Sequence, residues 1–147
     1  MQNINQAEKL LQSWVTLSGI IKNSRITKGL QYNEAIVMNV IFKRFTEDGE
    51  GVVSIKEITQ KTRMLKSLVN RTVNSLIKKG FVKRCESTGD KRLVYVKCEK
   101  EKLDTFLKVH NGSLAHAGNI IDIIGDEDTQ AFIRIVNKIE KSGYSLA

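Results

Sequence analysis

The side chains with the most distinctive chemistry lie close together in the middle of the sequence. Five polar residues recur there at a spacing that places them on one side of a helix, namely Lys66, Ser67, Asn70, Arg71 and Asn74. A guanidinium can donate two hydrogen bonds to guanine, and an amide can both donate to adenine and accept from it. We therefore expect Arg71 to suit guanine and Asn70 or Asn74 to suit adenine, with Lys66 and Ser67 suited to phosphate or mixed contacts.

A second cationic site follows at Gly89-Asp90-Lys91-Arg92. An arginine at the tip of a hairpin can enter a narrow minor groove of DNA, where the negative potential is enhanced. We expect Arg92 to do this, with Lys91 beside it. Asp90 is expected to orient Arg92 through a charge-assisted hydrogen bond rather than to touch phosphates. Ser54 completes the expected set of DNA-binding residues.

The excess positive charge of this 147-residue chain is confined to one third of its length. Residues 54–97 hold twelve Lys and Arg against three Asp and Glu, a net charge of +9, whereas the whole chain carries +8. A surface without a polyanionic partner usually intersperses its charges. The block therefore favours a partner such as DNA, and a merely solvated basic face is the alternative interpretation.

Helical periodicity dominates the first half of the chain. The Ser54/Glu57 pair has the spacing of a capping box, in which each residue satisfies a backbone N–H at the start of a helix. Gly80 is a suitable helix-ending residue. The expected order is a helix at 5–23, a connection at 24–31, a helix at 32–45, a turn at 47–51, a helix from Ser54 to 62, a turn at 63–65 and a helix at 66–79.

After Gly80 the period changes to two, which is typical of strands. Two strands, at about 81–85 and 93–98, are expected to form a hairpin around the polar turn at 87–90. A long helix then begins near Glu101 and is interrupted at Gly125, and acidic residues at 126–128 suit the start of a final helix.

This pattern predicts a mainly α fold with a small β-hairpin wing, that is, a winged helix-turn-helix. Within a single regulator spanning 1–147, we expect a DNA-binding lobe at 30–98 and dimerisation helices at 1–29 and 99–147. The terminal helices carry broad apolar faces that a small winged-helix core could not cover. We therefore expect a homodimer that binds a palindromic site.

The chain resembles the multiple antibiotic resistance regulator (MarR) family. The resemblance rests on the order of elements, on Ser54–Ile58, on the run ending Lys78–Arg84 and on the wing Asp90–Arg92. It implies a two-fold dimer, Lys66–Asn74 in the major groove, Arg92 in the minor groove, and a ligand or redox signal that alters DNA affinity. Leu68 and Thr72 depart from the family's usual residues, so the operator cannot be carried over. The segment 99–102 also departs from the family pattern, which puts the junction between the last strand and the next helix in doubt.

Other candidate sites have simpler explanations. Cys85 and Cys98 are expected to lie several residues apart along the hairpin, too far for a disulfide, and Cys98 continues the apolar alternation of its strand. His110 and His116 are six residues apart on one helix and so point to different sides, which argues against a metal site. No catalytic motif is present, so we expect no enzyme and no cofactor.

The sequence therefore predicts a dimeric, cytoplasmic, DNA-binding transcription regulator, most simply a repressor released by a small effector whose binding residues are unknown. No apolar run is long enough to span a membrane, and the polar start of the chain is unlike a signal peptide. Two alternatives stay open. One is a winged-helix protein-interaction module that binds no DNA, and the other is a metal-sensing regulator that uses His110 or His116.

Overall fold

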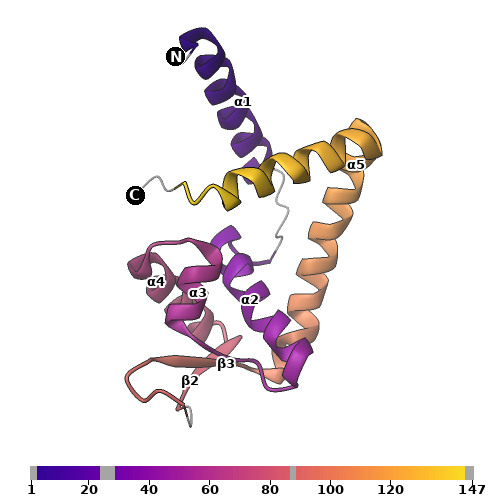
Figure 1. Ribbon diagram of the computed structural model, residues 1–147. Helices are drawn as coiled ribbons and strands as arrows, with labels where there is room; N and C mark the ends of the chain where they lie inside the picture. Colours follow the sequence, from indigo (N-terminus) through magenta and orange to yellow (C-terminus); the bar gives the residue numbers. More distant parts are fainter. Residues whose placement is uncertain (1–2, 24–28, 87–88, 145–147) are drawn as a thin grey trace. The chain divides into compact units, whose positions relative to one another are not determined.

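The computed structural model describes residues 3–23, 29–86 and 89–144, in two compact units, Met1–Gly112 and Ser113–Ala147 (Figure 1). The expected connection at 24–31 and turn at 87–90 therefore fall partly outside the described residues. The elements are α1 (Ile4–Asn23), α2 (Tyr32–Asp48), β1 (Val52–Ser54), α3 (Ile55–Thr62), α4 (Lys66–Lys78), β2 (Val82–Cys85), β3 (Tyr95–Cys98), a 3-10 turn (Lys100–Lys102) and α5 (Leu103–Lys141).

The helices begin and end close to the predicted residues. α2 runs three residues further than expected and ends at Gly49, which has the left-handed φ of 74°. α3 ends at Arg63, also left-handed at φ 59°, so that a three-residue turn separates α3 from α4. This arrangement of two helices around a short turn is the helix-turn-helix that the sequence predicts.

The sheet has three antiparallel strands in the order β1-β3-β2, not the two that the sequence analysis expected. β3 lies in the middle, with Val96 opposite Val53 of β1 on one side and opposite Arg84 of β2 on the other. β1 was missed because its three residues directly follow a glycine turn and end at the capping Ser54, which leaves too few residues to reveal a period of two.

The first unit has one hydrophobic core, in which α2, α3 and α4 pack together and against the sheet. Its innermost apolar side chains are fully or almost fully buried: Val37, Met38, Ile41, Val53, Ile58, Val69, Val73, Leu76, Val82, Val96 and Phe106. Phe106 belongs to the first turns of α5 and packs against Phe42 of α2. The apolar side of α4 therefore packs against this core, while its polar side remains in solvent.

The terminal helices are amphipathic and leave their apolar sides exposed. α1, in the first unit, has no buried residue, and its Leu10, Trp14 and Leu17 are exposed. In the second unit, Gly125 interrupts the helix with φ 86° and ψ 166°, as predicted. Beyond it, Phe132 and Ile135 are about half exposed. None of the described helices is both long and apolar enough to cross a membrane.

Candidate nucleic-acid interface

α4 separates its apolar and polar residues cleanly. Val69, Thr72, Val73 and Leu76 are buried. Thr72 satisfies its hydroxyl within the helix by donating to the carbonyl oxygen of Leu68. The opposite side of α4 is therefore free to bind a partner through its polar groups.

The polar side of α4 forms a shallow concave surface, which we call the α4 groove. It is lined by Ser67, Asn70, Arg71, Asn74, Ser75 and Lys78. Four of the five residues predicted for this helix thus come together in one place. The fifth, Lys66, is exposed at the first position of the helix and does not line the groove.

The groove also contains Lys78, which the sequence analysis did not assign to it. Lys78 follows Asn74 by four residues and Arg71 by seven, so it continues the same helical stripe. That spacing was visible in the sequence. The positive charge of the groove therefore extends further along α4 than the first three turns.

Glu34 of α2 binds the C-terminal end of α4. Its carboxylate is almost fully buried, and it accepts hydrogen bonds from the Ser75 hydroxyl at 2.6 Å and from Lys79 Nζ at 2.7 Å. A third bond, from the backbone N–H of Gln31, caps α2. Burial alone would raise the pKa of Glu34, but the bonds from Lys79, Ser75 and Gln31 outweigh it and lower the pKa. The charged carboxylate fixes the last turn of α4 to the start of α2.

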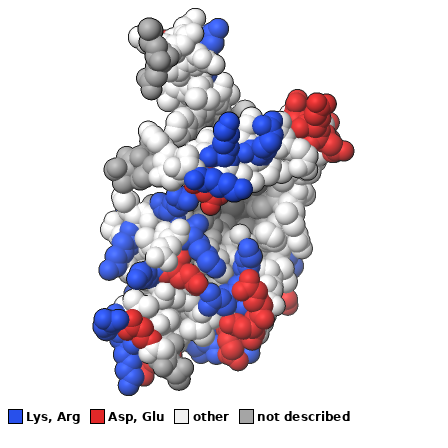
Figure 2. All heavy atoms as spheres, viewed as in Figure 1, with Lys and Arg blue, Asp and Glu red and all other residues white. Residues whose placement is uncertain are grey.

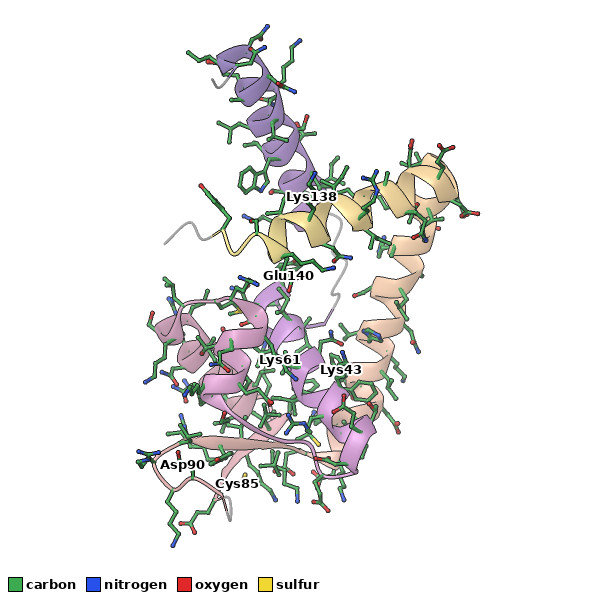
Figure 3. The ribbon with its side chains drawn as sticks, viewed as in Figure 1. Lys43, Lys61, Cys85, Asp90, Lys138 and Glu140 are labelled. Atoms are coloured by element: carbon green, nitrogen blue, oxygen red, sulfur yellow. The ribbon has the colours of Figure 1, made fainter. Side chains whose placement is uncertain are left out.

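The hairpin tip, where Figure 3 labels Asp90, has the geometry predicted for Asp90 and Arg92. Arg92 donates to both carboxylate oxygens of Asp90, from Nε and Nη2 at 3.0 Å each, and its backbone N–H also bonds Asp90 at 3.0 Å. The side-chain bond from Arg92 lowers the pKa of Asp90. Because 89% of the Arg92 side chain is exposed, this pairing orients the guanidinium without covering it. Lys91, next to it, is exposed as well.

Ser54 has a structural role in this surface. Its hydroxyl accepts the backbone N–H of Glu57 at 3.0 Å, which is the cap expected at the start of α3. Glu57 does not complete the expected box, because its carboxylate pairs with the Arg44 guanidinium of α2 instead. A contact of Ser54 with DNA stays a prediction, and its oxygen is already engaged in the cap.

Basic side chains gather over these elements. In the view of Figure 2, Lys and Arg side chains lie over this part of the first unit, with some acidic side chains among them and a larger acidic patch beside them. Two different elements, a helix and a hairpin, thus present cations and hydrogen-bond donors within the first unit. Such a surface suits the phosphates and base edges of a DNA duplex.

The two cysteines lie apart on neighbouring strands, as expected. Cys85 is opposite Tyr95 and Cys98 is opposite Val82. Both thiols are free, and burial raises the pKa of each. Cys98 is almost fully buried and serves as a core residue.

The histidines lie in different surroundings. His110 stacks against Phe106 at a centroid distance of 5.9 Å and lies near Phe42, whereas His116 is exposed. Within the described part of the chain, no three His, Cys, Asp or Glu side chains are grouped as metal ligands would be.

The fold and this surface define a winged-helix protein, and comparison with known proteins supports that class. The chain is similar to the solved structure of AbsC, a MarR family transcriptional regulator from Streptomyces coelicolor, with 17% identity, a TM-score of 0.76, and 97% of this chain and 95% of that one covered. A mutant MarR from E. coli complexed with operator DNA gives 13% identity, a TM-score of 0.74, and coverage of 94% and 99%.

A third structure, from work on how 6-hydroxynicotinic acid regulates DNA binding by BpsR of Bordetella bronchiseptica, gives 11% identity, a TM-score of 0.75 and 91% coverage of each chain. No curated protein sequence matches the chain significantly. The sequence model of the MarR family matches residues 44–93, from the end of α2 to the hairpin. The predicted resemblance to the MarR family and its winged-helix fold is confirmed.

Proposed function

We propose that the chain is a sequence-specific DNA-binding transcription regulator rather than an enzyme. The observation that carries this proposal is the α4 groove, where Asn70, Arg71 and Asn74 share one solvent-facing surface of a second helix-turn-helix helix. The second helix of this motif usually enters the major groove. Arg92 at the hairpin tip supplies a second contact, to the minor groove. The operator-bound MarR structure supports the same assignment, because its fold is shared by this chain.

The proposed regulator acts as a homodimer. Leu10, Trp14 and Leu17 recur at helical spacing on α1 and are all exposed. Phe132, Ile135 and Ile139 do the same in the second unit, each close to half exposed or more. Apolar faces of this kind mark protein interfaces. A second copy of the chain would cover them and would place two α4 helices on a palindromic site.

The dimer can be tested by sedimentation. We expect the wild-type protein to sediment as a dimer, because burial of these faces removes apolar surface from water. Ile135→Asp should shift it to the monomer, whereas Asn137→Asp, which adds the same charge at an exposed polar position of the same helix, should leave it dimeric. A monomeric wild-type protein at micromolar concentration would refute this part of the proposal.

The proposed regulator is a repressor released by a small effector. The BpsR structure, which comes from work on the regulation of DNA binding by 6-hydroxynicotinic acid, supports a ligand-responsive member of this fold. An effector lowers DNA affinity only if it binds better to a conformation with the wrong spacing of the two α4 helices. Repression can be tested with a reporter gene placed behind the DNA sequence that the protein selects.

DNA binding is tested by titrating a mixed-sequence duplex at low salt and then selecting from a randomised library. Arg92→Ala should weaken binding to every sequence and reduce the slope of log affinity against log salt by about 1. Arg71→Ala should relax base preference at one position of each half-site. Lys108→Ala, which removes one exposed charge from α5, is the control and should change neither. If the wild-type protein bound no duplex even at low salt, a protein-interaction module would be the better interpretation.

A further inference from the structure

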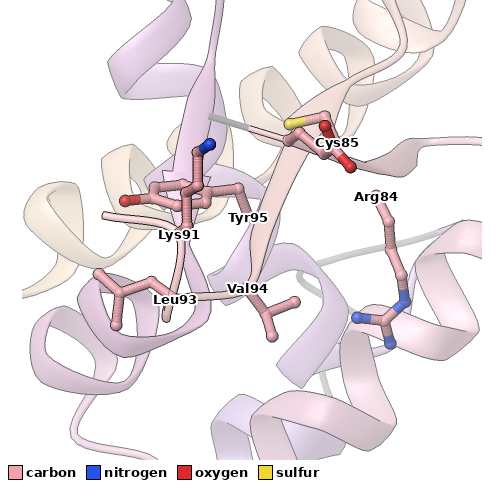
Figure 4. Close-up of a pocket in the computed structure, with 7 residues that line it drawn as sticks. Arg84, Cys85, Lys91, Leu93, Val94 and Tyr95 are labelled. Carbon is pink, nitrogen blue, oxygen red and sulfur yellow. The ribbon is translucent and has the colours of Figure 1, made fainter. Parts of the chain in front are cut away.

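Side-chain hydrogen bonds of two kinds connect α4 to other elements of the first unit. One kind is exposed: Arg84 of β2 donates from Nη2 to the amide oxygen of Asn74, at 2.8 Å. Both side chains are exposed, and Figure 4 shows Arg84 reaching away from the hairpin strands toward a neighbouring helix. Because water competes for both partners, this bond contributes little to the position of α4.

The other kind of bond is buried, at Glu34 of α2. Only 1% of Glu34 is exposed. Its Oε2 atom accepts from the Ser75 hydroxyl at 2.6 Å, and its Oε1 atom accepts from Lys79 Nζ at 2.7 Å and from the backbone N–H of Gln31 at 2.8 Å. Both oxygens are therefore engaged, and a buried charge that loses a partner is strongly disfavoured. This network, which we call the Glu34 network, resists displacement of the end of α4 relative to α2.

Ser75 belongs both to the Glu34 network and to the DNA-binding surface proposed above. It lines the α4 groove, where it directly follows Asn74, and Arg71 lies one turn earlier. Because all three lie within about one turn of the same helix, a displacement of Ser75 also displaces the other two side chains. Contacts to base edges require their partners within about 0.5 Å of the correct position. The Glu34 network therefore controls how well Asn74 and Arg71 can meet the bases.

The charge of Glu34 makes a positioning role distinguishable from an electrostatic one. A carboxylate close to a surface that binds DNA repels the phosphates, so its removal alone should raise the affinity for every sequence. Loss of a positioning bond should instead lower the affinity for the preferred sequence, where the fit to the bases matters. The two effects of removing the Glu34 charge thus have opposite signs.

We propose that Glu34 is a positioning residue for base recognition. Because it is buried, it does not touch DNA; it holds α4 where the α4 groove fits the base edges. This inference rests on the proposed DNA-binding function. Lys79 shares the positioning role through its bond to Glu34, whereas the adjacent Lys78 lines the α4 groove itself.

The test measures the affinity of each variant for two duplexes, the sequence that the wild-type protein selects from a randomised library and a mixed-sequence control. The ratio of the two affinities reports base recognition, and a partly unfolded fraction cancels from it because it lowers both affinities alike. Glu34→Gln should lower this ratio by about fivefold or more, the effect of one lost base contact. Glu47→Gln, which removes the same charge from an exposed position near the other end of α2, should leave the ratio unchanged.

Variants of Lys79 make the result specific to the Glu34 network. Lys79→Met should lower the ratio as well, and Lys79→Arg, which keeps a charged donor for Glu34, should retain it. The double variant Glu34→Gln/Lys79→Met has the net charge of the wild-type protein, so it should keep the wild-type affinity for the mixed-sequence duplex and the reduced ratio of Glu34→Gln. An unchanged ratio in Glu34→Gln, or an equal fall in Glu47→Gln, would overturn the inference. A wild-type protein that selected no sequence would refute the proposed function itself.

Discussion

Lys79 Nζ lies 2.7 Å from the Glu34 carboxylate, so a partly exposed lysine at the end of α4 is bonded to a charge in the core of the first unit. The two residues are 45 positions apart in the chain. Because the same carboxylate also binds Ser75, two side chains near the end of α4 depend on it. The position of the α4 groove therefore depends on whether the buried Glu34 carboxylate of α2 is charged.

Lys79→Met should destabilise the protein by about 1–3 kcal/mol, since it removes one partner of a buried charged group. Lys78→Met is the matched control, because Lys78 is the neighbouring exposed lysine of the same helix and carries the same charge. It should change the free energy of unfolding by less than about 0.5 kcal/mol. Urea denaturation measures both. Equal effects of the two substitutions would show that the Glu34 bond contributes nothing.

The lowered pKa of Glu34 makes part of the stability depend on pH. A carboxylate whose pKa is lower in the folded state stabilises the protein fully above its unfolded pKa of about 4.3, and this contribution is lost as the pH falls through the folded pKa. Glu34→Gln cannot titrate. The stability advantage of the wild-type protein over Glu34→Gln should therefore be constant near pH 7 and shrink below about pH 4. Urea denaturation between pH 3 and 7 measures it, and an advantage that grew on acidification would contradict the lowered pKa.

Most of the fold was predictable because its signals are local. The boundaries of α3 and α4 follow from the capping Ser54, the apolar period and Gly80, all within a few residues of one another. The residues that line the α4 groove were predictable for the same reason, since one helical stripe contains them.

The parts that were missed depend on contacts between distant segments. Glu34 reads as an ordinary acidic residue in a first helical turn, which usually faces water, and only its pairing with Lys79 explains its burial. The Arg84–Asn74 bond likewise requires the packing of β2 beside α4. Neither pairing leaves a periodic signal in the sequence.

The two cysteines should remain unlinked under mild oxidation. Their paired residues place them three positions apart along the strands, about 10 Å, whereas a disulfide needs Cα atoms within about 7 Å. Burial raises the pKa of both thiols, so little thiolate is present at pH 7. We expect slow alkylation by iodoacetamide, with half-buried Cys85 modified before buried Cys98. Mass spectrometry of peptides reports the order. Rapid formation of a Cys85–Cys98 disulfide would contradict this geometry.

Alanine substitutions at Gly49 and Gly51, in the turn after α2, distinguish the cost of backbone strain from the cost of overpacking. Both have left-handed φ, 71° and 74°, so alanine is strained at either by about 1–2 kcal/mol. A Cβ at Gly49 meets nothing within 4 Å, whereas at Gly51 it would lie 2.8 Å from Cys98 Sγ and 3.1 Å from Phe45 Cβ. Gly51→Ala should therefore cost about 1–3 kcal/mol more than Gly49→Ala, the usual cost of overpacking. Urea denaturation of the two variants gives this difference directly, and equal destabilisation would mean that the contact between this turn and β3 is looser than the structure shows.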